Sequence, residues 1–266
     1  MALLLLLAAG AASAEQYVLS APGQWKQSHS DAVAAAGGTL VWSHGGSGLG
    51  VATSDNANFL ANLQSIGGFQ DAVADMVVDW VGPMAVEEGL TDQSVNTSND
   101  RFFPQQWNMQ SMQAPAAWAA GCTGGVPGVS AADVRVAVLD GGIHSTHQDL
   151  AANLDVACSA SFVPGQPFNN DLGTFWHGTH VAGIVAAADN SVGTVGVAPD
   201  ATIIGVKVLH GGGGTFGAVI GGILYASDPA AFGAGSCARA DIINMSLGAQ
   251  FNKNLPGAGP LVAALN

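Results

Sequence analysis

Residues 176–184 read WHGTHVAGI, a stretch in which a histidine opens a run of small and apolar residues. The pattern predicts a well-buried helix with His177 in its first turn, and the small residues would let this helix pack close to a neighbouring element. Imidazole is the side chain whose unperturbed pKa lies nearest to neutrality, so a histidine fixed at the end of an element is a plausible general base. His177 is therefore the first candidate catalytic residue.

A second candidate lies upstream, at the end of a predicted strand. Residues 134–139 read VRVAVL, a short β-branched run that is typical of a buried strand, and Asp140-Gly141-Gly142 follows it. Open α/β sheets place their functional residues at the carboxyl ends of strands. Asp140 is thus a candidate catalytic acid, and the alternative is an aspartate that only begins a turn.

The strand with Asp140, the run HQDL at 147–150 and the His177 stretch resemble the subtilisin-like serine proteases in order and in spacing. The resemblance continues through GTVGVAP at 193–199, VKVL at 206–209 and INMSLG at 243–248. It covers about residues 101–266 and implies an α/β fold with a doubly wound parallel sheet. It also implies that Asp140 orients His177, and that His177 is the general base for a serine nucleophile.

By the same resemblance, two short backbone segments form the edges of a substrate cleft. One edge consists of Gly213, Gly214 and Thr215, and the opposite edge consists of Ser246, Leu247 and Gly248. A peptide held between two such edges becomes an added β-strand, so main-chain hydrogen bonds supply affinity with little demand on its sequence. We therefore expect protein or peptide substrates and broad specificity.

Two parts of the family's catalytic machinery are not found in the sequence. Family members carry the nucleophile in a GTSMA helix start and the oxyanion asparagine in an AAGN strand end, and neither motif occurs here. Ser246 matches only half of a nucleophile elbow, because Asn244 takes the place of its first glycine. Gly141 is a further departure, since most relatives have Ser or Thr after the acid. We expect the 266 residues to be the first portion of a catalytic domain and to be inactive alone.

The loop that follows the His177 helix resembles the high-affinity calcium loop of the family. Calcium takes six to eight oxygen ligands, many of them main-chain carbonyls. The implied ligands are the carbonyls of Ala188, Val192 and Thr194, the side-chain oxygen of Asn190 and the carboxylate of Asp149. A further glutamine ligand is either Gln105 or Gln106, and the alignment leaves this open. The alternative is an ordinary turn that ends a helix.

Four histidines suggest a different kind of site. His144 and His147 are three residues apart, as are His177 and His180, and zinc binds neutral imidazoles. The carboxylate-bearing helix of a zinc hydrolase is not apparent, and the family resemblance gives His180 a structural role. A metal-dependent hydrolase is therefore the weaker alternative.

The first 82 residues predict a leader and a small domain. Residues 1–14 read MALLLLLAAGAASA, an apolar run that is too short to span a bilayer and ends in a small-x-small cleavage site. This predicts a signal peptide and a secreted protein, although the basic start of a signal peptide is missing and a retained leader is the alternative. Residues 15–82 predict a β-α-β-β-α-β order with a last strand over 73–81, which specifies a small ferredoxin-like α+β sandwich.

The position of this small domain resembles that of the family's inhibitor-I9-type propeptide, which assists folding and blocks the cleft as an intramolecular inhibitor. The polar, acidic residues 83–100 would then form the linker that is cut on maturation, and residues 101–266 the catalytic portion. The alternative is a small domain of unrelated binding function, in a non-catalytic protein that binds or inhibits a protease.

Composition limits the partners. The net charge is −13, from 6 Lys and Arg against 19 Asp and Glu, and such a chain repels phosphate backbones and anionic bilayers. We therefore expect no nucleic acid and no membrane contact after signal cleavage. The chain is also expected to be a monomer. Cys122, Cys158 and Cys237 permit one disulfide and one free thiol, and the pairing stays open; without a C-x-x-C pair, zinc ribbon and thioredoxin functions are excluded.

Overall fold

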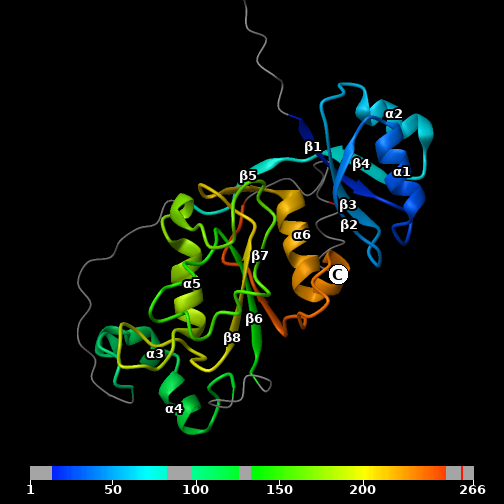
Figure 1. Ribbon diagram of the computed structural model, residues 1–266. Coiled ribbons are helices and arrows are strands. Elements are labelled where there is room, and N and C mark those ends of the chain that lie inside the picture. Colours follow the sequence, from blue (N-terminus) through cyan, green and yellow to red (C-terminus); the bar gives the residue numbers. More distant parts are fainter. Residues whose placement is uncertain (1–13, 83–97, 126–132, 250–258, 260–266) are drawn as a thin grey trace, which may run out of the picture. The chain divides into compact units, whose positions relative to one another are not determined.

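A computed structural model describes residues 14–82, 98–125, 133–249 and residue 259 (Figure 1). The chain forms two compact units, Met1–Asp75 and Met76–Asn266. The predicted signal peptide, except its last residue, and residues 83–97 of the predicted linker lie outside the described residues. No helix in the described ranges is long and apolar enough to cross a membrane.

The first unit is an antiparallel sheet with two helices. Its elements are β1 (Glu15–Ser20), α1 (Gln27–Ala35), β2 (Thr39–His44), β3 (Leu49–Ser54), α2 (Phe59–Ile66) and β4 (Asp71–Ala74). The strand order is β2-β3-β1-β4, and β1 is antiparallel to both of its neighbours. This is the ferredoxin-like order that the sequence predicts.

Alternating residues of β1 supply the core of the first unit. Tyr17 and Leu19 point to the same side of the strand and pack with Val33 of α1 and with Phe59 and Leu63 of α2. The ring centroids of Tyr17 and Phe59 are 4.8 Å apart. The unit therefore has a hydrophobic core of its own.

The prediction of one last strand over 73–81 is wrong. β4 ends at Ala74, and Val77–Asp79 forms a separate strand, β5, which belongs to the second unit. β4 pairs with β1, whereas β5 pairs with a strand far along the sequence. The apolar pattern indicated extended chain in both places, but it carried no information on the partner of either strand.

The second unit is built on a parallel sheet. Its elements in the first part are η1 (Phe103–Gln105), α3 (Trp107–Ser111), α4 (Ala114–Ala119), β6 (Arg135–Asp140), β7 (Ala160–Ser161) and η3 (Leu172–Thr174). They are followed by α5 (His177–Ala186), β8 (Thr202–Lys207), β9 (Gly213–Thr215), α6 (Phe216–Ser227), η4 (Pro229–Phe232) and β10 (Ile242–Asn244). The sheet order is β10-β6-β8-β7, and every pair in it is parallel.

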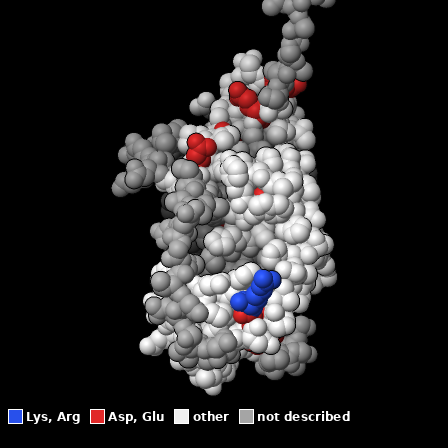
Figure 2. Space-filling view, turned by 90° about the vertical axis from the view of Figure 1, so that its left-hand side faces the viewer, with Lys and Arg blue, Asp and Glu red and all other residues white. Residues whose placement is uncertain are grey.

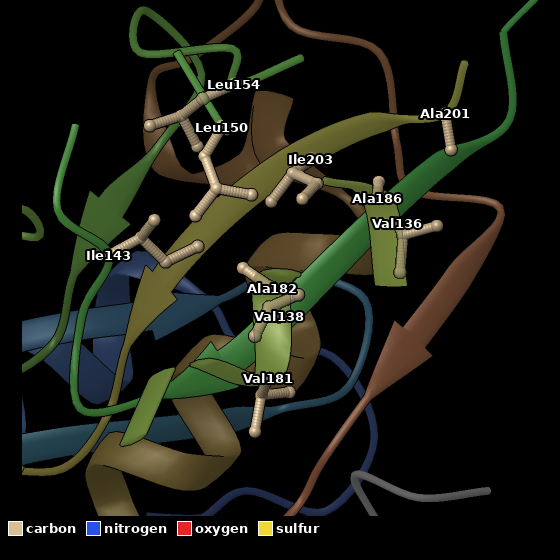
Figure 3. Close-up of a cluster of buried hydrophobic side chains, with 10 residues drawn as sticks. All are labelled: Val136, Val138, Ile143, Leu150, Leu154, Val181, Ala182, Ala186, Ala201 and Ile203. Carbon is tan, nitrogen blue, oxygen red and sulfur yellow. The ribbon is translucent and has the colours of Figure 1, made fainter. Parts of the chain in front are cut away.

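Helices cover both faces of this sheet (Figure 1). Val136 and Val138 of β6 pack in one cluster with Ala182 of α5 (Figure 3). On the other face, a Cβ added to Gly222 of α6 would lie 3.3 Å from Cδ2 of Leu139. Because successive residues of a strand point to opposite sides, β6 is buried on both faces, which is why its sequence is apolar without alternation.

A disulfide joins Cys158 and Cys237, whose Cα atoms are 5.6 Å apart. Cys158 lies just before β7, and Cys237 lies before β10, so the bridge connects segments that lead into the two edge strands of the sheet. Cys122 is free and exposed. The structure thus decides the pairing that the sequence left open.

Candidate active site

The two residues predicted to be catalytic lie in direct contact. Nδ1 of His177 is 2.9 Å from both Oδ1 and Oδ2 of Asp140. Asp140 is the last residue of β6 and is fully buried, while His177 is the first residue of α5. A carboxylate that holds Nδ1 leaves Nε2 as the nitrogen that can exchange a proton with a reacting group. The structure thus brings together the two residues that the sequence singles out, and their roles as acid and base stay a prediction.

The Asp140 carboxyl sits in a buried, partly polar environment. The N–H of Gly141 donates to its Oδ1 at 2.6 Å. Burial raises the pKa of Asp140 above its ordinary value, the hydrogen bonds from His177 and Gly141 act in the opposite direction, and the nearby charge of Asp171 raises it further. The carboxylate therefore depends on its few donors to remain ionised.

Asp171 fixes the start of the His177 helix. Its Oδ2 accepts hydrogen bonds from the main-chain N–H of Thr179 at 2.8 Å and from the Thr179 hydroxyl at 2.6 Å. The first N–H groups of a helix have no partner within the helix, and a carboxylate there is also favoured by the helix dipole. Sequence reasoning missed this residue, since Asp171 lies eight positions before Thr179 and no capping motif of fixed spacing connects them.

The backbone around His177 is tightly constrained. Phe175 and Trp176, directly before it, have φ values of 52° and 62°, in the left-handed region that non-glycine residues seldom adopt. A Cβ added to Gly178 would lie 2.2 Å from the carbonyl oxygen of Gly142. Only glycine at 178 lets α5 approach the turn after Asp140 this closely, which explains the small residue that follows the histidine.

Both predicted edges of the substrate cleft contact one extended segment of the second unit. β5 pairs antiparallel with β9, with Val77 opposite Thr215, Val78 opposite Gly214 and Asp79 opposite Gly213. From the other predicted edge, which has no regular structure, the N–H of Gly248 donates to the carbonyl of Trp80 at 2.9 Å. Residues 77–80 therefore lie as an added strand against residues that the resemblance assigns to substrate binding.

The side chain of Trp80 anchors this segment. It is 5% exposed, and its indole Nε1 donates to the carbonyl of Gly214 at 2.8 Å. Its ring meets Phe216 edge-on, with centroids 5.3 Å apart. A large aromatic side chain thus packs next to β9, a feature that sequence reasoning missed.

The predicted calcium loop is held at both ends by one residue. The main-chain carbonyl of Asp149 accepts from the N–H of Ala188 at 2.9 Å, and its Oδ2 accepts from the N–H of Thr194 at 3.0 Å. Within the loop, Oδ1 of Asn190 accepts from the N–H of Val192 at 2.8 Å. The other carboxylate oxygen, Oδ1 of Asp149, is buried and has no hydrogen-bond partner among the described residues.

Of the two glutamines, Gln106 has its amide engaged elsewhere. Its Oε1 accepts from the N–H of Val195 at 2.9 Å, and its Nε2 donates to the carbonyl of Val195 at 2.8 Å. A buried carboxylate lies near the loop instead, because Oδ1 of Asp100 accepts from the N–H of Asn190 at 3.2 Å. Burial raises the pKa of Asp100. Sequence reasoning missed Asp100 because it counted residues up to 100 as linker.

The four histidines do not converge on one point. Nδ1 of His177 is bound to Asp140, and the rings of His144 and His147 are 6.2 Å apart, with His144 edge-on to Trp176. Within the described ranges, no three His, Cys, Asp or Glu side chains form a group that could hold a metal ion. The described residues therefore give no support to the zinc site considered as an alternative.

Comparison with known proteins gives the family. Residues 131–266 match the subtilase family (Peptidase S8). The chain is 43% identical over 122 residues to Subtilisin DY of Bacillus licheniformis, a match that covers 46% of this chain and 39% of the relative. It is 41% identical over 143 residues to Subtilisin E of Bacillus subtilis (strain 168), covering 53% and 32% of the two chains.

A solved structure has the same fold over almost the whole chain. Fervidolysin from Fervidobacterium pennivorans, described as a keratinolytic enzyme related to subtilisin, superposes with a TM-score of 0.64 at 18% identity. The match covers 98% of this chain and 39% of fervidolysin, so the chain spans well under half the length of these relatives. With the Asp140–His177 pair in place and a family match over residues 131–266, the chain belongs to the subtilase family of subtilisin-like serine endopeptidases.

Proposed function

We propose that this chain supplies the acid and base of a secreted serine endopeptidase that hydrolyses peptide bonds with an Asp-His-Ser triad. The observation that carries the proposal is the contact of Nδ1 of His177 with both carboxylate oxygens of Asp140, at 2.9 Å. In the proposed reaction, Nε2 of His177 takes the proton of a serine hydroxyl that attacks the peptide carbonyl, and then gives it to the leaving amine. The buried Asp140 stabilises the imidazolium that forms in between.

The nucleophilic serine and the oxyanion asparagine are proposed to come from sequence outside the 266 residues. Neither the GTSMA nor the AAGN motif occurs in the chain. Acyl transfer requires both a nucleophile and donors for the developing oxyanion, so the 266 residues alone are proposed to be inactive. Ser246 is a poor substitute, because its hydroxyl accepts from Nδ2 of Asn244 at 3.0 Å and lies beside the proposed substrate strand.

A fluorophosphonate probe, which labels activated serines, tests this proposal. We expect no labelling and no casein hydrolysis with the 266-residue chain, and both with the protein made from the gene when it is read beyond the codon for Asn266. His177→Ala should abolish labelling of the longer protein, whereas Cys122→Ser, a change at an exposed free thiol, should leave it intact. Labelling of the 266-residue chain, mapped to the peptide that contains Ser246, would contradict the proposal.

We further propose that residues 15–82 are the propeptide and that residues 77–81 inhibit the cleft as a substrate-like strand. A strand added to an exposed edge is bound through main-chain hydrogen bonds, as β5 is bound to β9. The N–H groups of Trp80 and Val81 both donate to the carbonyl of Gly212, at 3.0 and 3.1 Å. The same edges would hold protein substrates once this segment has been released.

Replacing the anchor of this segment should loosen it. Trp80→Ala removes the indole hydrogen bond to Gly214 and the edge-on contact with Phe216, each worth about 1 kcal/mol. We therefore expect amide hydrogen exchange at Val81 and Gly248 to become about tenfold faster or more, measured by NMR on the 266-residue chain. Val77→Ala, which truncates a side chain that is 75% exposed on the same strand, is the matched control and should leave the exchange rates unchanged. Equal protection in Trp80→Ala and in the original chain would show that Trp80 is no anchor.

We also propose a structural calcium ion bound by Asp149 together with the loop after α5. A buried carboxylate oxygen without a partner costs about 1–3 kcal/mol, and a cation at Oδ1 of Asp149 would remove this cost. The remaining proposed ligands are the carbonyls of Ala188, Val192 and Thr194 and the side-chain oxygen of Asn190. All are hard oxygen donors, which suit calcium. Asp100 is proposed as a second carboxylate of the site, in place of Gln106.

Calcium should raise the thermal stability of the chain. At a calcium concentration 100 times the dissociation constant, binding adds about 2.7 kcal/mol, which corresponds to a rise in Tm of about 5–10 °C for a chain of this size. Asp149→Asn should remove the calcium-dependent rise, while Asp200→Asn, at a carboxylate outside the site, should keep it. Magnesium should have little effect because it demands a small octahedral site. The measurement is calorimetry with calcium, magnesium or EGTA, and equal Tm values in all three would rule out the site.

A further inference from the structure

Lys207 is a lysine buried in the interior of the second unit. It is the last residue of β8, stands opposite Asp140 in the register of β6 and β8, and has no exposed surface. The whole chain contains 6 Lys and Arg, and most of the described surface in Figure 2 carries no charged side chain. Burying a cation costs several kcal/mol unless its surroundings compensate. The position of this cation therefore calls for a reason.

The contacts of Lys207 are those of an ammonium ion. Its Nζ donates to three main-chain carbonyls, of Gly141, of Asn170 at 2.9 Å and of Leu209 at 2.8 Å. A lysine ammonium has three N–H donors and no acceptor, so three carbonyls satisfy it completely. A neutral amine would turn its lone pair toward one of these oxygens. The site is thus built for the charged form.

The three carbonyls belong to the segments that hold the catalytic pair. Gly141 directly follows Asp140, and Asn170 directly precedes Asp171, which binds the first turn of α5. The N–H of Leu209 donates to the carbonyl of Asp140 at 3.2 Å, so the segment that contains Leu209 is also hydrogen-bonded to the acid. One side chain therefore connects the strand end that carries the acid with the loop that positions the helix of the base.

The charges around Lys207 also fit this role. Asp140, Asp171 and Lys207 are all fully buried, and Nδ1 of His177 lies 2.9 Å from Oδ2 of Asp140. Burial lowers the pKa of Lys207, while the negative charges of Asp171 and Asp140 raise it. With Lys207 charged, the three buried groups sum to −1, and an imidazolium at His177 neutralises them. Without the charge of Lys207, no buried cation would compensate the carboxylates of Asp140 and Asp171, and this favours protonation of one of them.

We propose that Lys207 is a positioning residue for the catalytic acid, whose ammonium group fixes the turn after Asp140 and keeps that carboxylate charged beside His177. The proposal rests on the proposed function of Asp140 and His177 as the acid–base pair. Lys207 acts through Asp140 and does not touch the substrate strand or the imidazole in the described structure. Its effect should therefore be visible in the Asp140–His177 hydrogen bond without any turnover.

The test compares Lys207→Met with the original 266-residue chain by proton NMR of the His177 Nδ1–H, which gives a low-field resonance when it is bound to a carboxylate. We expect this resonance to disappear on acidification at a pH about one unit higher in Lys207→Met, a tenfold change in the protonation equilibrium of Asp140, because a nearby cation favours the charged carboxylate. Arg135→Met is the matched control. It removes a cation from the first residue of β6, where Arg135 pairs with Asp155 at 2.8 Å, and should leave the pH of disappearance unchanged.

A Lys207→Met chain that is less stable but loses the resonance at the original pH would overturn the proposal, since Lys207 would then only pack. If Lys207→Met does not fold, the Nζ resonance of Lys207 in the ¹⁵N-lysine-labelled original chain shows whether this side chain is charged. An ammonium signal with slow proton exchange at neutral pH, where Asp140 is ionised, supports the proposal, and a neutral amine at that pH overturns it. Absence of the Nδ1 resonance from the original chain would instead refute the acid–base pair itself, so the two failures are distinguishable.

Discussion

Asp140→Asn should lower kcat of the complete peptidase by about 10⁴-fold, the loss that follows when the acid of a catalytic triad becomes its amide. Both carboxylate oxygens accept from the same imidazole nitrogen, Nδ1 of His177, at 2.9 Å. An asparagine can turn its NH₂ group toward Nδ1, which then becomes the acceptor and moves the ring proton to Nε2. Nε2 can no longer take a proton from the serine. The geometry survives, but the tautomer is the wrong one.

The measurement is steady-state hydrolysis of a peptide substrate by the longer protein that we propose to carry the nucleophile. KM should change little, because the proposed substrate contacts are made by β9 and Gly248 and not by the Asp140 side chain. Asp155→Asn is the control, since this carboxylate pairs with Arg135 at the opposite end of the same strand and should leave kcat unchanged. A loss of less than tenfold for Asp140→Asn would mean that Asp140 does not set the tautomer of His177.

The parts of the site that were predicted from sequence are those encoded in one short stretch. Asp140 stands at the end of an apolar run with glycines after it, and His177 opens a run of small residues. In each case the local pattern determines both the element and the end of the element at which the side chain sits. The topology of a parallel sheet then brings a strand end and a helix start together. That the two side chains form a pair was implied by the resemblance to the subtilisin-like proteases, without any knowledge of their distance.

Other residues of the site act through contacts between distant parts of the chain, and no local sequence pattern predicts these contacts. Trp80 meets Gly214, which is 134 positions away, and Asp100 meets Asn190. Lys207 is the instructive case, because a charged residue inside an apolar strand that is buried on both faces is already anomalous in the sequence. The anomaly shows that a partner must exist. It does not say that the partners are three carbonyls around the proposed catalytic acid.

Removing the disulfide should destabilise the second unit by about 4 kcal/mol. The bridge between Cys158 and Cys237 closes a loop of 79 positions, and the loss of loop entropy in the unfolded chain grows with the logarithm of that length. A hydrogen bond also holds the backbone at the bridge, since the hydroxyl of Tyr225 donates to the carbonyl of Cys158 at 2.9 Å. We expect the double variant Cys158→Ser/Cys237→Ser to unfold at a clearly lower guanidinium concentration and with a steeper transition, because the unfolded chain without the bridge exposes more surface.

The third cysteine makes this experiment selective. Cys122→Ser alters an exposed thiol outside the bridge and should leave the unfolding midpoint in place, so it controls for the loss of sulfur as such. Dithiothreitol should reproduce the effect of the double variant in the original chain and should add nothing to the double variant. If reduction leaves the midpoint of the original chain unchanged, the bridge does not form in solution. Structural disulfides persist in oxidising compartments, so a stabilising bridge would support export of the protein, whereas its absence would remove the structural argument for secretion.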